Sequence, residues 1–291
     1  MQEKESQKIL EAGFQQAKAI TCQYAKTFYF ASKFLPPQKR LAAYSIYAIC
    51  RISDESVDTK NNSLKEKRLH DIKSDIDSAY HSPSFRNALL LAFRQTVISY
   101  NIPKQYFDDL LLGMEMDLGK KRYKNFDELY LYCYRVAGVI GLIMLKILGS
   151  NNTEAQKHSI ELGIAMQLTN ILRDIKEDYA LNRIYLPEDE MKKFNVTENH
   201  ICLEKIDENF KNLMKFQIQR TEKFYQSSEL GIKMMTTRNS RLVVKLMKEM
   251  YAAILTAIIK NRYDIFSQRA HINFLQKIVI YLKTILESEF L

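Results

Sequence analysis

The chain has 291 residues, of which 46% are hydrophobic, enough for a sizeable core. Only 8 glycines and 5 prolines interrupt it, which excludes the many turns of a β-sandwich or β-barrel and favours one all-α domain, a helical bundle over residues 1–291. The formal net charge of +9 suits anionic substrates or lipid surfaces. Nucleic acid is not expected as a partner, because no nucleic-acid-binding motif or dense basic tract occurs.

Helical periodicity runs along almost the whole chain. Turn signals at Pro36-Pro37, Ser82-Pro83 and Asn101-Ile-Pro103 separate the early helices. The stretch 181–199 is predicted to be a loop with at most a short helical turn. The predicted helices cover residues 5–30, 38–58, 63–80, 84–99, 103–120, 126–148, 152–179, 203–228, 236–261 and 271–288.

Two pairs of aspartates with the same spacing lie far apart in the chain, Asp54 with Asp58 and Asp174 with Asp178. Residues four apart share one face of a helix, so each pair directs two carboxylates the same way. A single pair of this kind is usually a solvated surface. Here each pair follows an apolar run, which favours a cavity lining. Two such faces turned towards each other would suit Mg²⁺ and a diphosphate.

Amide and basic residues accompany both pairs. Gln167 and Asn170 lie in the same helical stripe as Asp174, and Arg173 directly precedes it. Arg51 lies three residues before Asp54, where it would bind a diphosphate or form an ion pair with Asp54 or Glu55.

Two glycines, Gly138 and Gly141, lie among bulky residues of one predicted helix. They predict either a ligand passing close to the backbone or close packing of two helices, and the sequence does not choose. The C-terminal segment from Ile272 to Leu291 is apolar on one face, with Lys277 and Lys283 between. Packing onto the bundle is the favoured interpretation, and contact with a membrane surface is the alternative.

The remaining patterns limit the chemistry and the location. The first residues are charged and lack the apolar core of a signal peptide. The longest apolar run, Val136 to Leu148, contains Lys146 and is shorter than the ~20 residues that span a bilayer. We therefore expect a cytoplasmic protein, with peripheral membrane contact as a further hypothesis. The five histidines have no metal-ligand spacing and no dinucleotide or P-loop motif occurs. The cysteines are predicted to be reduced and mostly buried: Cys22, Cys50, Cys133 and Cys202.

Taken together, these motifs resemble the squalene/phytoene synthase family over roughly residues 20–275, and most closely its phytoene synthases. The family motifs are Tyr24-Ala-Lys-Thr-Phe28, Arg51-Ile-Ser-Asp-Glu-Ser-Val-Asp58, Tyr132-Cys-Tyr-Arg-Val-Ala-Gly138, Gln167-Leu-Thr-Asn-Ile-Leu-Arg-Asp-Ile-Lys-Glu-Asp178 and Arg183-Ile-Tyr-Leu-Pro187. The stretches 122–134 and 263–269 add to the likeness with phytoene synthases.

The resemblance implies an isoprenoid-synthase fold with a central cavity and a head-to-head condensation of two prenyl diphosphates through a cyclopropylcarbinyl diphosphate. Geranylgeranyl diphosphate would give phytoene. Farnesyl diphosphate, the alternative, would give dehydrosqualene, or squalene with NADPH. The implied cofactor is Mg²⁺, with Mn²⁺ as a substitute. The small residue Ser32, one turn after Phe28, favours the longer substrate.

The resemblance also implies roles for individual residues. The implied metal ligands are Asp54, Asp58, Asn170, Asp174 and Asp178. The implied substrate contacts are Lys26, Thr27, Tyr47, Arg51, Gln167, Arg173, Tyr251 and Arg269. Tyr132 would orient a metal ligand or face a carbocation. Rival interpretations are a chain elongator or terpene cyclase, whose motifs are absent, and a non-catalytic assembly relative, which typically lacks the aspartates.

Overall fold

The computed structural model describes residues 2–57, 62–82, 87–150 and 152–288. Over these ranges the chain is helical apart from its connections and one isolated bridge between Ser150 and Met235, so the all-α prediction is confirmed. The helices are α1 (Gln2–Tyr24), α2 (Lys26–Ser32), α3 (Pro37–Val57), α4 (Asn62–His81), α5 (Ala88–Ser99), α6 (Lys104–Gly119), α7 (Phe126–Cys133), the π-helical η1 (Tyr134–Gly138), α8 (Val139–Leu148), α9 (Ala155–Arg173), α10 (Ile175–Ala180), α11 (Glu188–Lys193), α12 (Glu198–Cys202), α13 (Glu208–Lys233), α14 (Arg238–Lys260) and α15 (Phe274–Ser288).

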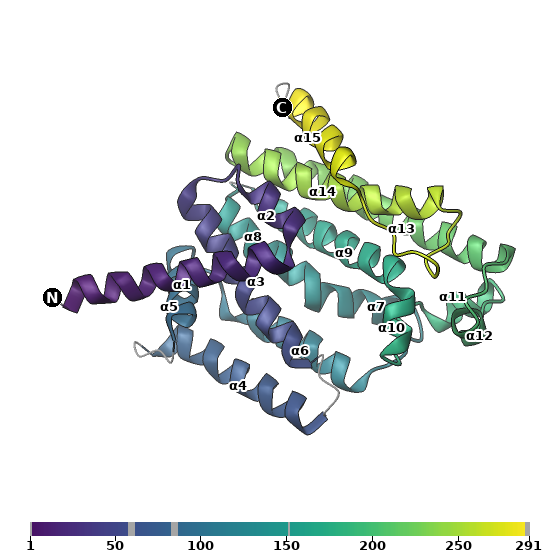
Figure 1. Ribbon diagram of the computed structural model, residues 1–291, viewed down its shortest axis with the longest axis horizontal. Helices are drawn as coiled ribbons and strands as arrows, with labels where there is room; N and C mark the ends of the chain where they lie inside the picture. Colours follow the sequence, from purple (N-terminus) through teal and green to yellow (C-terminus); the bar gives the residue numbers. More distant parts are fainter. Residues whose placement is uncertain (1, 58–61, 83–86, 151, 289–291) are drawn as a thin grey trace.

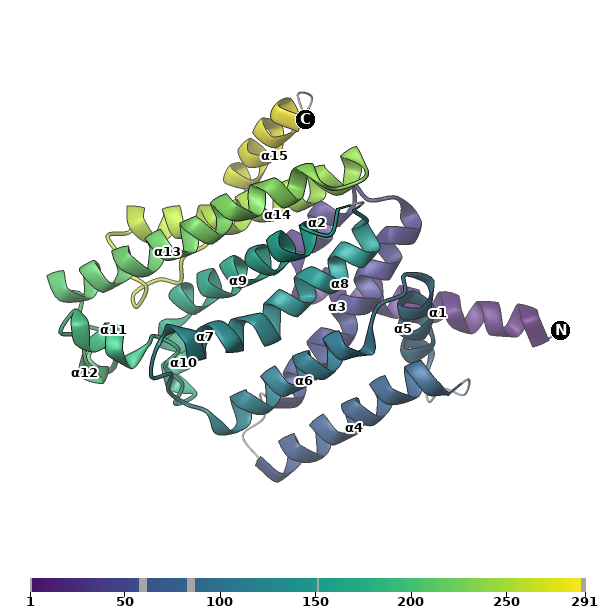
Figure 2. The ribbon, with the colours of Figure 1, turned by 180° about the vertical axis from the view of Figure 1, so that it is seen from behind.

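Helix α9 runs through the middle of the bundle. It packs against α13 and α14 on one side and against the continuous helix formed by α7, η1 and α8 on the other (Figure 2). A second group of helices, α1, α3, α4, α5 and α6, completes the bundle. The N-terminal half of α1 projects away from the bundle, and α15 crosses the outside of α14 (Figure 1).

Two predicted helices are interrupted where they approach the centre of the bundle. The predicted helix 5–30 is divided at Ala25, which leaves helical geometry with φ −127° and ψ 58°. The predicted helix 152–179 is divided at Asp174, with φ −108° and ψ 21°. Helix α13 begins five residues later than predicted, because the side chain of Asp207 accepts a hydrogen bond from the backbone N–H of Phe210 and caps it. The predicted loop 181–199 contains the short helix α11 and the first two residues of α12.

The most apolar helix of the described residues is a core element. Phe126–Leu148 forms one continuous helix of 23 residues, long and apolar enough to cross a membrane by length and composition alone. This differs from the expectation based on the shorter run, because the helix begins ten residues before Val136. Half of its most apolar part is buried within the bundle, between α6 and α9. A core helix of a bundle has these properties.

The paired glycines mark close helix packing. A Cβ atom on Gly141 would lie 2.1 Å from the carbonyl oxygen of Ser159, and one on Gly163 would lie 2.2 Å from that of Ala137. Helix α9 therefore approaches α8 at Gly141 and η1 at Gly163 closely enough to exclude any side chain at these points. Of the two interpretations of the sequence, close packing is confirmed at Gly141.

The four cysteines are free, as predicted, but they are not mostly buried. Cys133 is buried and Cys50 is partly exposed, whereas Cys22 and Cys202 are exposed. Cys202 ends the short helix α12, and Cys22 lies in the last turn of α1.

Candidate active site

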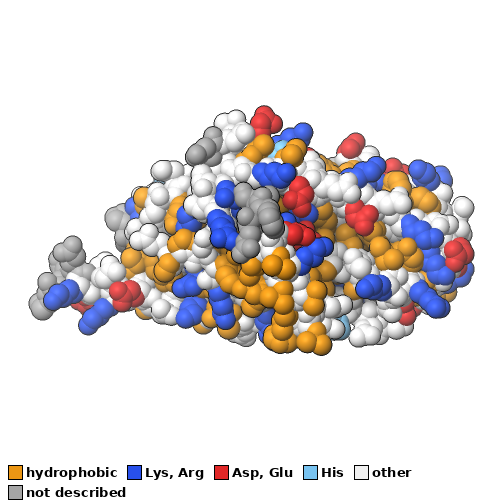
Figure 3. All heavy atoms as spheres, turned by 90° about the horizontal axis from the view of Figure 1, so that it is seen from above, with side chains coloured by type: hydrophobic (Ala, Val, Ile, Leu, Met, Phe, Trp, Pro, Cys, Tyr) orange, Lys and Arg blue, Asp and Glu red, His pale blue; other side chains and the backbone are white. Residues whose placement is uncertain are grey.

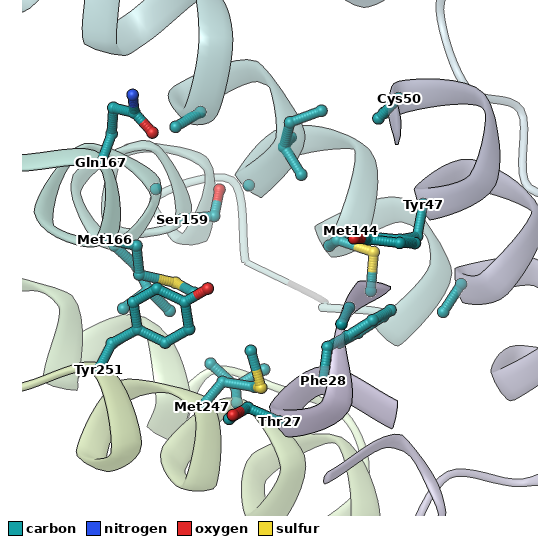
Figure 4. A pocket seen from close by; sticks show the side chains of 18 of the residues that line it. Thr27, Phe28, Tyr47, Cys50, Met144, Ser159, Met166, Gln167, Met247 and Tyr251 are labelled. Carbon is teal, nitrogen blue, oxygen red and sulfur yellow. The ribbon is translucent and has the colours of Figure 1, made fainter. Parts of the chain in front are cut away.

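An elongated cavity of about 680 Å³ lies between α2, α3, α8, α9, α13 and α14. It follows α9 from Arg173 to His158, about 22 Å at the rise of an α-helix. Charged and amide side chains lie at the Arg173 end, and aliphatic side chains lie at the other. Figure 4 shows the middle of this cavity, where Phe28, Tyr47, Met144, Met166, Met247 and Tyr251 surround the open space.

The polar end collects residues from four separate parts of the chain. Asp54 comes from α3, Asn170 and Arg173 from the last turn of α9, and Arg269 from the segment before α15. Lys26 and Thr27 from the first turn of α2 line the same cavity. The break at Ala25 places these two residues at the start of a new helix. The structure thus brings together six predicted site residues.

The carboxylate of Asp174 is held by two arginines. Arg173 donates from Nε to Oδ1 at 2.7 Å and from Nη2 to Oδ2 at 2.5 Å. Arg269 donates to the same two oxygens at 2.8 Å and 3.0 Å. Burial raises the pKa of Asp174, but the hydrogen bonds from Arg173 and Arg269 outweigh burial and leave it below the usual value. Asp174 is therefore ionised in this arrangement.

Asp178 lies one turn further on in α10 and has the opposite shift. Burial and the nearby charge of Asp174 raise the pKa of Asp178 to about 7. Asp178 lies near Arg183 and Tyr185, beside the cavity and outside its lining. The two aspartates therefore concentrate negative charge at the junction of α9 and α10.

Two further predicted residues are not seen in the cavity lining. Asp58 lies outside the described residues. Arg51 is partly exposed, and its guanidinium group lies over the ring of Tyr24, 4.6 Å from the centroid, outside the cavity lining. A cation over an aromatic face is attracted by the ring electrons.

Tyr132 does not face the cavity. Its hydroxyl group donates to Oδ2 of Asp117 at 3.0 Å, and Tyr185 donates to Oδ1 of the same carboxylate at 2.8 Å. The two tyrosine rings stack with centroids 5.0 Å apart, and Arg183 donates to the backbone oxygen of Asp117 at 3.3 Å. Burial raises the pKa of Tyr132 and of Tyr185, so both remain protonated donors. Of the two suggested roles of Tyr132, direct contact with a carbocation is not supported by this position.

Asp117 is the residue of this network that the sequence analysis missed. It is only 9% exposed, in α6, and its charge raises the pKa of Asp178 whereas that of Arg183 lowers it. The network therefore lies next to Asp178. In the sequence, Asp117 is a lone carboxylate at the helical spacing of Leu110, Gly113 and Met114. This spacing places it on the buried face of α6.

The middle of the cavity is aromatic and sulfur-rich. Tyr47, Gln167 and Tyr251, the expected substrate contacts, all line it. The rings of Tyr47 and Phe28 lie 5.8 Å apart. Burial raises the pKa of Tyr47 to about 12 and that of Tyr251 above its usual value, so both hydroxyl groups stay neutral at physiological pH. Asn170 donates a long hydrogen bond of 3.4 Å to Gln167.

The far end of the cavity is closed by aliphatic side chains. Ser32, which was expected to leave room for a long tail, does not line the cavity; its buried hydroxyl group donates to the backbone oxygen of Tyr29 and contacts the hydroxyl group of Tyr44, both at 2.9 Å. Cavity length is therefore set by other residues. The residues that close this end are Leu145, Leu148, Ile232, Met235, Val243 and Val244.

The donor chemistry of the polar end fits a hard divalent cation. Asp54 and Asn170 line the cavity and carry oxygen ligands, and Asp174 and Asp178 add two carboxylates at the junction of α9 and α10. Within the described residues, no three His, Cys, Asp or Glu side chains already form a closed metal-binding cluster. A cation that binds Asp174 would compete with Arg173 and Arg269 for its two carboxylate oxygens.

A model of the squalene/phytoene synthase family matches residues 22–276. The chain belongs to this family, as its motifs predicted. It is 38% identical to the phytoene synthase of Arthrospira platensis over 273 residues, which cover 89% of this chain and 88% of that protein. It is 36% identical to the 15-cis-phytoene synthase of Synechocystis over 288 residues, which cover 90% and 81% of the two chains.

Solved structures share the fold. A crystal structure of a dehydrosqualene synthase superposes with a TM-score of 0.89 at 24% identity, covering 97% of this chain and 98% of that chain. A squalene synthase from Alicyclobacillus acidocaldarius superposes with a TM-score of 0.81 at 23% identity, covering 88% and 96%. The predicted isoprenoid-synthase fold with a central cavity is confirmed.

Proposed function

We propose that this protein is a prenyltransferase that condenses two prenyl diphosphates head to head, with geranylgeranyl diphosphate as substrate and phytoene as product. The observation that carries the proposal is one cavity with two unlike ends. Carboxylate, amide and guanidinium groups lie at one end, and an aliphatic tunnel closed at its far end leads away from them. A diphosphate with a long apolar tail has the same division of polarity.

The polar end would bind and activate the diphosphates. Arg173, Arg269 and Lys26 line it and supply positive charge to a departing diphosphate. Asp54, Asn170, Asp174 and Asp178 would hold Mg²⁺, together with Asp58 by its spacing from Asp54. When bound, the cation neutralises diphosphate charge and favours cleavage of the C–O bond. Mn²⁺ has similar ligand preferences and would serve as a substitute.

The middle of the cavity would protect the carbocations. Phe28, Tyr47 and Tyr251 present aromatic surfaces, and Met144, Met166 and Met247 present polarizable sulfur. Phe28 and the three methionines offer water no strong hydrogen bond, and water would otherwise capture a cation. The allylic cation formed by loss of the first diphosphate is then attacked by the double bond of the second substrate. Loss of a proton closes the cyclopropane ring.

The second half of the reaction would decide the product. Loss of the second diphosphate and rearrangement produce a linear cation, which becomes phytoene by losing a proton. The farnesyl alternative would give dehydrosqualene by the same proton loss, or squalene if NADPH supplied a hydride. The phytoene synthases of Arthrospira platensis and Synechocystis, which match most of this chain, support the geranylgeranyl substrate.

The test is to incubate the purified protein with Mg²⁺ and either farnesyl or geranylgeranyl diphosphate, with and without NADPH, and to identify the hydrocarbon by mass spectrometry. A C40 hydrocarbon formed without NADPH is the expected result. A C30 hydrocarbon would replace the geranylgeranyl assignment, with NADPH dependence separating squalene from dehydrosqualene. No hydrocarbon from either substrate would favour a non-catalytic assembly role. The variant Asp54→Asn is expected to be inactive. The matched control is Asp71→Asn, at an exposed aspartate of α4, which is expected to keep wild-type activity.

A further inference from the structure

Helix α15 has two apolar faces, and only one of them is packed. On the packed face, Tyr281 stacks on Phe34 at 5.1 Å and meets Phe30 edge-on at 5.8 Å. Thr284 is 1% exposed, and Glu287 forms an ion pair of 2.8 Å with Lys245 of α14. The packing interpretation of the C-terminal segment is therefore confirmed for this face.

The other face carries large apolar side chains in water. Leu275, Val279, Leu282 and Leu286 are 71%, 63%, 53% and 63% exposed. Their spacings of four, three and four residues place them in one stripe along the helix. Phe274, 73% exposed, adds a ring at the start of the helix. We call these five residues the α15 patch. Hydrophobic side chains gather below the centre of the view in Figure 3 and protrude at its lower edge.

The surroundings of the α15 patch are basic. Residues 260–288 contain five basic residues and two acidic ones, Asp264 and Glu287; the basic ones are Lys260, Arg262, Arg269, which is bound to Asp174, Lys277 and Lys283. Asp264 accepts hydrogen bonds from the backbone of Phe266 and Ser267, so its charge is used within its own turn. Glu287 is shared between Lys245, at 2.8 Å, and Lys283, at 3.8 Å, and the side chain of Lys283, beside the stripe, is 74% exposed. A symmetric contact with a second copy would bring these positive charges together, whereas an anionic lipid surface attracts them.

We propose that the α15 patch docks this protein on the surface of an anionic lipid bilayer, with α15 lying in the interface. The inference rests on the proposed function, because docking would serve an enzyme with prenyl substrates and a hydrocarbon product. Helix α15 packs on α14, and α14 supplies Val243, Val244, Met247 and Tyr251 to the cavity. Docking therefore keeps the cavity wall next to the bilayer, from which prenyl tails enter and into which a hydrocarbon without a head group must leave.

The first test is flotation of the full-length protein with vesicles of phosphatidylcholine alone or mixed in equal parts with phosphatidylglycerol. We expect flotation with the mixed vesicles, and a fall of about tenfold in the bound fraction for the double variant Val279→Asp/Leu282→Asp. Leu203→Asp, at a residue 73% exposed far from α15 in the sequence, is the matched control and should float like the wild type. Absent flotation of the wild type, or equal flotation of the double variant, would overturn the proposal.

A second measurement does not depend on how the charged variant folds. The chain contains no tryptophan, so Val279→Trp places a single indole on the α15 patch and Leu203→Trp places one elsewhere. Mixed vesicles should shift the fluorescence of Val279→Trp to shorter wavelength and leave Leu203→Trp unchanged. Equal responses would overturn the proposal, as would a wild-type dimer in light scattering that the double variant abolishes. Hydrocarbon formation in detergent micelles, measured on the same proteins, tests the proposed function separately.

Discussion

Arg269 donates two hydrogen bonds to the carboxylate of Asp174, which lies 95 residues earlier in the chain. Arg173 donates to the same two oxygens, so one carboxylate holds two guanidinium groups at the polar end of the cavity. Both arginines line the cavity. Asp174 thus positions the groups that we expect to bind diphosphate, in addition to its expected role as a metal ligand.

Replacing Arg269 by glutamine should lower kcat/KM by about 100-fold, because one charged donor to the leaving group is lost. Steady-state kinetics with the confirmed prenyl diphosphate would measure this. Arg238→Gln, an exposed arginine at the start of α14, is the control and should behave like the wild type. Wild-type kinetics in Arg269→Gln would show that Arg269 serves only to neutralise Asp174.

The raised pKa of Asp178 predicts how stability depends on pH in the absence of metal. Its folded pKa of about 7 lies above the usual 3.8, so between these values the folded state holds a proton that the unfolded state has lost. The free energy of unfolding should therefore fall as pH rises from about 4 to 7. Asp178→Asn removes this titration. Urea unfolding in EDTA at several pH values should show a flatter profile for the variant, and parallel profiles would contradict the assignment.

The hydrogen bonds of Asp117 predict energetic coupling with Tyr132. Tyr132→Phe removes one hydrogen bond to a buried carboxylate and should cost about 1.5–3 kcal/mol of stability. Asp117→Asn disturbs the same contact, so the two changes should be clearly non-additive in both stability and kcat. A double-mutant cycle measures the coupling. Additive effects would mean that Asp117 does not act through Tyr132.

The close approach of α8 and α9 predicts a cost for one added methyl group. In Gly141→Ala the new Cβ would lie 2.1 Å from the carbonyl oxygen of Ser159, so a backbone must shift, at about 1–3 kcal/mol of stability. Gly119 ends α6 in open space, since a Cβ added there would meet no heavy atom within 4 Å, so Gly119→Ala should be neutral or slightly stabilising. Equal unfolding midpoints in urea would contradict this.

The aliphatic end of the cavity predicts which residues control substrate length. Val244→Phe adds volume at that end and should lower kcat/KM for geranylgeranyl diphosphate at least about tenfold more than for farnesyl diphosphate. Ser32→Ala, which does not line the cavity, is the matched control. If Ser32→Ala changed the preference and Val244→Phe did not, the cavity would not define the tail-binding site.

Much of the fold and most of the candidate site could be predicted from the sequence. Scarce glycine and proline with continuous helical periodicity indicated an all-α chain, because helix formation depends on local spacing that a sequence displays directly. The two aspartate pairs and the amides beside them were found for the same reason. Two interruptions were not predicted, at Ala25 and Asp174, because tertiary contacts decide where a long apolar pattern bends.

Only the tertiary structure decided which side chains meet. It joined Arg269 to Asp174, placed Tyr132 with Asp117 and Tyr185 beside the cavity, and excluded Ser32 from its lining. It also showed that α15 packs one apolar face and leaves the other exposed. The sequence by itself determined that the chain is helical, which chemical groups the candidate site contains and to which family the chain belongs. Partners distant in the chain depend on how helices cross, and no local pattern records that.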